Sequence, residues 1–171
     1  MKVYFYVIFL FLLNSCTSNT QIAANMDIKD VVEKFDHETF SDFNGFFVSI
    51  RQRVGINTIY ILQKDNLPVY FITYNNLTNS ITEINDSLLK KQNAKNYLLP
   101  EEINYKIKKF RQYGFMLLSV DKFNNVFIDP FHINNTPVLL RLDNSSNLKM
   151  IKRSPYYHHY KNNWYMNDQG K

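Results

Sequence analysis

The first residues to consider for catalysis or metal binding are four histidines, His37, His132, His158 and His159. Asp129 stands three positions before His132, so a turn could bring a carboxylate and an imidazole together. His158 and His159 are adjacent, and neighbouring side chains on a strand point to opposite faces, so this pair is poorly placed to bind one ion. The chain has no His-Glu-x-x-His motif and no pair of cysteines. We therefore expect hydrogen-bonded or surface histidines and no metal site.

Patterns typical of other enzyme classes are missing from the sequence. No Gly-x-Ser-x-Gly motif marks a serine nucleophile. Glycine occurs at four isolated positions, Gly45, Gly55, Gly114 and Gly170. No glycine-rich phosphate-binding loop can be built from them. The adjacent pair Glu101 and Glu102 falls at a predicted helix start, where negative charge is favourable, and its side chains would point about 100° apart. The sequence predicts a protein that is not an enzyme and needs no cofactor.

The best candidate binding surface in the sequence is the C-terminal segment. It interleaves basic and aromatic residues, namely Lys152, Arg153, Tyr156, Tyr157, Tyr160, Trp164 and Tyr165. Such side chains can stack on sugars, bases or lipid headgroups, and Tyr and Trp are common anchors of protein interfaces. The alternative is a terminal strand that packs its aromatic rings into the core. Binding through this segment predicts that Trp164 and the tyrosines are exposed on one face.

The elements that position these residues follow from the spacing of apolar side chains. Four apolar residues at helical spacing follow Asp27 and predict a capped helix over residues 27–35. Pro100, with glutamates after it and lysines further on, predicts a helix that ends at Gly114. Extended runs predict strands at residues 46–53, 58–62, 69–74, 81–84, 115–120, 126–129 and 136–142, although a helix could also begin near residue 81.

This order of elements predicts an α+β fold, with an N-terminal helix, an antiparallel meander, central helices and a second antiparallel meander. Within residues 46–53, strict alternation defines the two faces of the strand. One face has Phe46, Val48 and Ile50, and the opposite face has Phe47, Ser49, Arg51 and Arg53.

The N-terminus has the proportions of a secretion signal. Lys2 supplies a positive charge, and residues 3–13 form an unbroken apolar run. That run is shorter than the about 20 residues needed to span a bilayer. Cys16 follows closely and is the only cysteine of the chain, so it has no partner for an internal disulfide. An ordinary secretory signal followed by an incidental cysteine is the alternative.

The sequence Leu13-Asn14-Ser15-Cys16 resembles the lipobox of bacterial lipoproteins. Leu13, Ser15 and Cys16 match the usual pattern, whereas Asn14 is a less common residue at its position. The resemblance implies cleavage before Cys16, diacylation of its sulfur and acylation of the new amino terminus. Three acyl chains would anchor the protein to the membrane far more firmly than one.

The residue after the lipidated cysteine bears on the location. Thr17 stands where an aspartate would, by resemblance to lipoproteins of diderm bacteria, retain the protein at the inner membrane. No acidic run that resembles a surface-export signal follows. We therefore expect anchoring in the outer membrane, facing the periplasm. The predicted domains are a signal peptide at residues 1–15, a lipidated tether at residues 16–26 and one globular domain at residues 27–171.

Charge and location together limit the partners. The chain carries 20 Lys and Arg against 15 Asp and Glu, a formal net charge of +5. In the cell envelope this basic character favours anionic lipids, cell-wall polymers or an acidic protein over nucleic acid. The sequence therefore predicts an envelope lipoprotein that binds a protein partner, such as an immunity protein that meets an acidic toxin. The alternative is a module that binds glycan, cell wall or lipid through the C-terminal aromatic residues.

Overall fold

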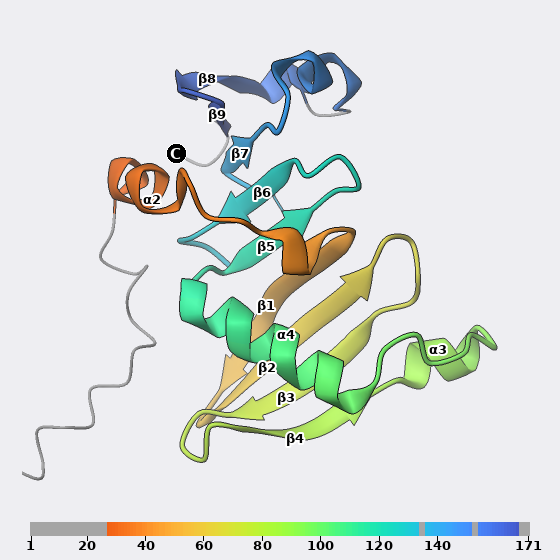
Figure 1. Cartoon of the computed structure of the whole chain (residues 1–171). Coiled ribbons are helices and arrows are strands. Elements are labelled where there is room, and N and C mark those ends of the chain that lie inside the picture. Colours follow the sequence, from red (N-terminus) through yellow and green to blue (C-terminus); the bar gives the residue numbers. More distant parts are fainter. Residues whose placement is uncertain (1–26, 134–135, 152–153, 168–171) are drawn as a thin grey trace, which may run out of the picture.

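The computed structural model describes residues 27–133, 136–151 and 154–167. Cys16, Lys152 and Arg153, to which the sequence assigns roles, lie outside the described residues. The strands of the described part are β1 (Phe46–Val54), β2 (Asn57–Lys64), β3 (Tyr70–Asn75), β4 (Ser80–Asn85), β5 (Leu117–Val120), β6 (Val126–Asp129), β7 (Leu139–Arg141), β8 (Tyr157–Lys161) and β9 (Trp164–Asn167). They form one antiparallel sheet in the order β4-β3-β2-β1-β5-β6-β7-β9-β8 (Figure 1).

The predicted α+β arrangement with two separate meanders is wrong, because a single nine-stranded sheet dominates the described residues. Strand β1 pairs with β5, with Phe47 opposite Ser119 and Val48 opposite Leu118, and this pairing fuses the two groups of strands. Each buried strand edge needs partners for its backbone N–H and C=O groups. The edge of β1 that faces away from β2 finds those partners in β5, about seventy residues further along the chain.

The described residues contain three short α-helices, α2 (Ile28–Phe35), α3 (Ser87–Lys91) and α4 (Pro100–Tyr113). The predicted cap of α2 is confirmed, since the Asp27 side chain accepts a hydrogen bond of 2.8 Å from the Asp30 N–H. At the start of α4 the Glu102 carboxylate accepts a hydrogen bond of 2.8 Å from the Leu99 N–H. Gly114 ends α4 in the left-handed conformation, with φ of 76°. No helix of the described residues is long and apolar enough to cross a membrane.

Helices α2 and α4 lie on the same face of the sheet (Figure 1). The main core forms between this helical layer and the sheet. Helix α4 contributes Ile103, Ile107 and Phe110, and the sheet contributes Val48, Tyr60, Leu62, Ile72, Leu118 and Ile128. A smaller cluster of Leu140, Leu142 and Tyr157 packs with Leu148 and Ile151, next to the 3-10 helix η3 (Ser145–Met150).

Candidate functional site

Three elements meet at one end of helix α4 and enclose a cavity of about 350 Å³. They are the tip of the β1–β2 hairpin, the tip of the β3–β4 hairpin and the last turn of α4 (Figure 1). The polar residues that line this cavity are Arg53, Thr58, Tyr60, Asn76 and Arg111. No carboxylate is among the described residues that line it. We call this space the arginine cavity.

A β-bulge places Arg53 in the arginine cavity. Ile50 pairs with Tyr60 and Gln52 pairs with Ile59, so Arg51 is an extra residue without a partner in β2. Beyond the bulge Arg53 pairs with Thr58 and shares its face. The predicted alternation, which put Arg53 on the face opposite Ile50, is therefore wrong. Bulges commonly redirect a side chain in this way next to functional sites.

Asn76 joins the three elements. Its N–H donates to the Ile56 carbonyl at 2.8 Å, which ties the two hairpin tips together. Its amide nitrogen donates to the Thr58 hydroxyl at 3.0 Å, and its amide oxygen accepts from Nη1 of Arg111 at 2.8 Å. The preceding Asn75 shapes the turn, since its side chain accepts the N–H of Leu77 at 2.9 Å. One amide side chain thus holds both hairpin tips against the end of α4.

The guanidinium of Arg111 is held in a fixed orientation. Nη1 also donates to the Tyr60 hydroxyl at 2.9 Å, and Cζ lies 4.0 Å from the centroid of the Tyr74 ring. Tyr60 is only 2% exposed, and this burial raises the pKa of its hydroxyl, while the charge of Arg111 opposes the rise. Burial prevails because the neutral phenol is favoured where water is excluded.

The guanidinium of Arg53 has a much weaker partner. Its Nη2 approaches the sulfur of Met116 at 3.5 Å, and a thioether is a poor acceptor. Among the described residues neither Arg53 nor Arg111 forms an ion pair. Two positive charges therefore face the same cavity without a carboxylate to balance them.

Exposed apolar side chains flank the arginine cavity at the hairpin tips. Val54 is 56% exposed, Ile56 is 54% exposed and Leu77 is 77% exposed. The hydrogen bond between the two tips keeps the turns that carry Ile56 and Leu77 next to each other, and Val54 is the last residue of β1. We call Val54, Ile56 and Leu77, together with Arg53 and Arg111, the hairpin-tip surface. Sequence reasoning missed it, although an isoleucine and a leucine inside otherwise polar turns were a visible signal.

The described C-terminal residues that were predicted to bind are not all exposed. Trp164 is completely buried, and its indole N–H donates to the Asp36 carboxylate at 2.9 Å. Tyr157 is also buried, with its hydroxyl donating to the Pro137 carbonyl at 2.8 Å. Tyr156 and Tyr160 are exposed, and Tyr165 is half-buried. Lys152 and Arg153 cannot be placed, because they lie outside the described residues. The exposed Trp164 that a stacking surface requires is not found.

The structure does not bring the four histidines together into one site. Asp129 is fully buried, and its Oδ1 accepts the N–H groups of Phe131 and His132 at 2.9 Å each, so it shapes a turn. His158 pairs with Met166 and His159 with Tyr165, on opposite faces of the sheet, as strand geometry predicts. Among the described residues no group of three or more His, Cys, Asp or Glu side chains could hold a metal ion.

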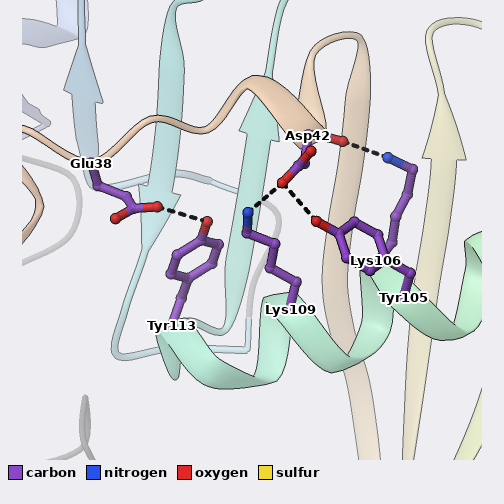
Figure 2. Close-up of polar contacts among 6 residues, drawn as sticks. All are labelled: Glu38, Asp42, Tyr105, Lys106, Lys109 and Tyr113. Atoms are coloured by element: carbon purple, nitrogen blue, oxygen red, sulfur yellow. Dashed lines mark hydrogen bonds and ion pairs between the residues drawn. The ribbon is translucent and has the colours of Figure 1, made fainter.

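A second polar cluster, centred on Asp42, fixes helix α4 to the segment before β1 (Figure 2). The Asp42 carboxylate pairs with Lys109 and accepts the Tyr105 hydroxyl at 2.9 Å, and Lys106 donates to the Asp42 carbonyl. The hydrogen bonds from Lys109 and Tyr105 lower the pKa of Asp42, and burial lowers the pKa of Lys106. Because these groups already satisfy one another, the Asp42 cluster is a structural link.

A polar cleft of about 350 Å³ lies between the segment after α2 and the β5–β6 end of the sheet, and its groups are also engaged. The Arg141 guanidinium donates to the carbonyls of Phe35 and Glu38, each at 2.8 Å. The Asp36 carboxylate accepts from Trp164 and from Asn162. Burial lowers the pKa of Arg141, whereas the nearby carboxylates oppose that shift. The contacts of Arg141 and Asp36 therefore join α2 to the sheet.

No family model matches the chain, and no curated protein or solved structure matches it. The function must be inferred from the residues of this chain. Among the sites described, the hairpin-tip surface is the one that combines exposed apolar side chains with unbalanced charge.

Proposed function

We propose that this protein is a lipoprotein of the cell envelope that binds a protein partner and catalyses no reaction. Cys16 would carry the lipid anchor in the outer membrane, with the domain facing the periplasm. In the immunity version of this proposal the partner is a toxin that reaches the same compartment. The lipobox-like sequence at Cys16 supports the location, and the hairpin-tip surface supports the partner.

The observation that carries the proposal is the exposure of Val54, Ile56 and Leu77 at two hairpin tips that a backbone hydrogen bond joins. A single exposed apolar residue is common, whereas a group of them next to polar residues typically marks an interaction site. Arginine is also enriched in protein interfaces, and Arg53 and Arg111 lie next to this group. A protein partner would bury the apolar side chains and shield the arginines from water.

Support for glycan, cell-wall or lipid binding through the C-terminal segment is weaker. Of the described residues predicted for it, Tyr156 and Tyr160 are exposed, at 52% and 37%. Trp164, the strongest stacking residue of the set, has no exposed surface. We therefore retain that function only as an outcome of the test.

Site-specific photo-crosslinking in the native cells tests the proposal. A photoreactive amino acid replaces Leu77 in one variant and Leu99 in the other. Both leucines are exposed, at 77% and 64%, so the two probes meet water equally well. Leu99 stands just before the first residue of α4. Leu77 follows Asn76, which is hydrogen-bonded to Arg111 in the last turn of α4. The two probes therefore lie near opposite ends of the helix, roughly 20 Å apart along its axis.

We expect one protein to crosslink strongly at position 77 and not at position 99. Equal crosslinking at both positions would show non-specific collisions and would contradict the proposal. Recovery of cell-wall fragments or phospholipid, with no protein, would contradict it as well.

A further inference from the structure

Of the two arginines of the hairpin-tip surface, Arg111 has a clear structural role in the fold and Arg53 does not. Arg111 stands in the last turn of α4, where a positive charge compensates the negative end of the helix dipole. Its Nη1 also satisfies the Tyr60 hydroxyl and the Asn76 amide. Arg53 has no such role. It belongs to a hairpin, it is exposed, and its described polar contact is the Met116 sulfur at 3.5 Å.

The position of Arg53 nevertheless depends on a local irregularity. Without the bulge at Arg51, alternation would direct Arg53 to the opposite face of the sheet, where Arg51 itself stacks on Phe71 at 4.7 Å. With the bulge, the side chain of Arg53 enters a cavity that already contains Arg111. Bringing two guanidinium groups together costs electrostatic free energy unless an anion lies between them.

We infer that the arginine cavity receives a carboxylate side chain of the protein partner, whose contacting face is therefore acidic. This inference rests on the proposed function and adds the chemistry of the partner to it. A planar guanidinium offers paired N–H donors that match the two oxygens of a carboxylate. The described residues give Nε and Nη2 of Arg111 no hydrogen bond, so this pair of donors is available for the two oxygens of one carboxylate.

The surroundings of the cavity favour an acidic side chain of a protein over a small free anion. Ile56 and Leu77 are exposed on the two turns that border the cavity, where a protein seated over the carboxylate would cover them. A charge pair covered by a bound protein is stronger than one open to solvent. A small anion such as phosphate would cover neither Ile56 nor Leu77 and would leave the charge pair open to solvent.

The test uses the intact lipidated chain in its native membranes, with the photoreactive residue at position 77. Crosslinking is compared for the unchanged chain, for Arg53→Glu and for Arg51→Glu. The two substitutions reverse the same charge two positions apart on the same strand, but only Arg53 faces the cavity. Arg51→Glu is therefore the matched control for the general change in net charge. Far-UV circular dichroism of both purified variants confirms that each one folds.

We expect Arg53→Glu to lower the yield of crosslinked protein by at least about tenfold, because a like charge then faces the partner's carboxylate. The Arg51→Glu yield is expected to stay within about twofold of the unchanged chain. Mass spectrometry of the crosslinked peptide is expected to identify an Asp or Glu within a few residues of the crosslink. Added salt is expected to lower the yield for the unchanged chain.

Two results would overturn the inference while leaving the proposed function intact. In the first, the same protein is crosslinked equally in both charge-reversal variants. In the second, the crosslinked peptide carries no acidic residue. By contrast, the absence of any crosslinked protein from the unchanged chain would overturn the proposed function itself. Crosslinking to anionic phospholipid that depends on Arg53 would overturn both and would assign the cavity to the membrane surface.

Discussion

Replacement of Trp164 tests how the C-terminal strands are held to the rest of the fold. Trp164 is fully buried, and its indole N–H donates to the Asp36 carboxylate at 2.9 Å, at the end of α2. Removal of a buried tryptophan ring typically lowers the free energy of unfolding by about 3–5 kcal/mol. Trp164→Phe keeps most of the apolar ring and loses the hydrogen bond to a charged group, which contributes about 1.5–3 kcal/mol.

We therefore expect Trp164→Ala to cost more stability than Trp164→Phe, and both to cost far more than Tyr160→Ala. Tyr160 is the control because it is exposed on the neighbouring strand β8, where substitutions change stability by about 0.5 kcal/mol or less. Urea unfolding followed by far-UV circular dichroism measures all three free energies. A loss below about 1 kcal/mol in Trp164→Ala would refute the burial of this residue.

The same result decides how binding data on this residue should be interpreted. Small domains have total stabilities of about 5–15 kcal/mol, so Trp164→Ala removes a large fraction of that range. A loss of partner binding in Trp164→Ala would then report partial unfolding. The exposed Tyr156 and Tyr160 are the substitutions that test the C-terminal segment without this complication.

Three further predictions follow from other parts of the chain. Cys16→Ser is expected to abolish incorporation of labelled palmitate and to move the protein from the membrane fraction to the soluble fraction; membrane retention without label would contradict the lipid anchor. The pKa of Asp42 in the folded protein lies below its usual value of 3.8. Its ion pair therefore stabilises the fold fully at pH values above 3.8, and this stabilisation is lost as the pH falls through the lower folded pKa. The stability difference between the wild type and Asp42→Asn should thus shrink in acid, and a constant difference down to pH 2 in urea unfolding would refute this link. Asn76→Ala is expected to speed amide hydrogen exchange at both hairpin tips, since it removes the side-chain bonds to Thr58 and Arg111, and unchanged exchange would contradict its joining role.

Local features of this fold could be predicted from the sequence. The cap at Asp27 and the proline and glutamates at the start of α4 depend on neighbouring residues, and both are confirmed. The strand at residues 81–84, which competed with a helix, is also confirmed as part of β4. These signals act within a few residues, so a single sequence displays them.

The joining of the strands into one sheet depended on information that local patterns do not contain. The pairing of β1 with β5 connects residues far apart in the chain, and apolar alternation is the same whether one sheet or two form. The bulge at Arg51 likewise cannot be predicted from the apolar pattern. One unpaired residue reverses the faces of the strand residues that follow it. The candidate site was missed for this reason, because its two arginines come together only through the bulge and through the contacts of Arg111 with Tyr60, Tyr74 and Asn76.

The most direct test of the central claim is amide hydrogen exchange of the lipidated protein in its native membranes, compared with the same protein purified in detergent. We predict slower exchange in the membranes at residues 54–58 and 75–80, which form the two hairpin tips. Exchange in strand β8, at Tyr157–Lys161, is predicted to be the same in both preparations. Protection confined to β8, with unchanged exchange at the hairpin tips, would contradict the claim and would place binding on the C-terminal segment.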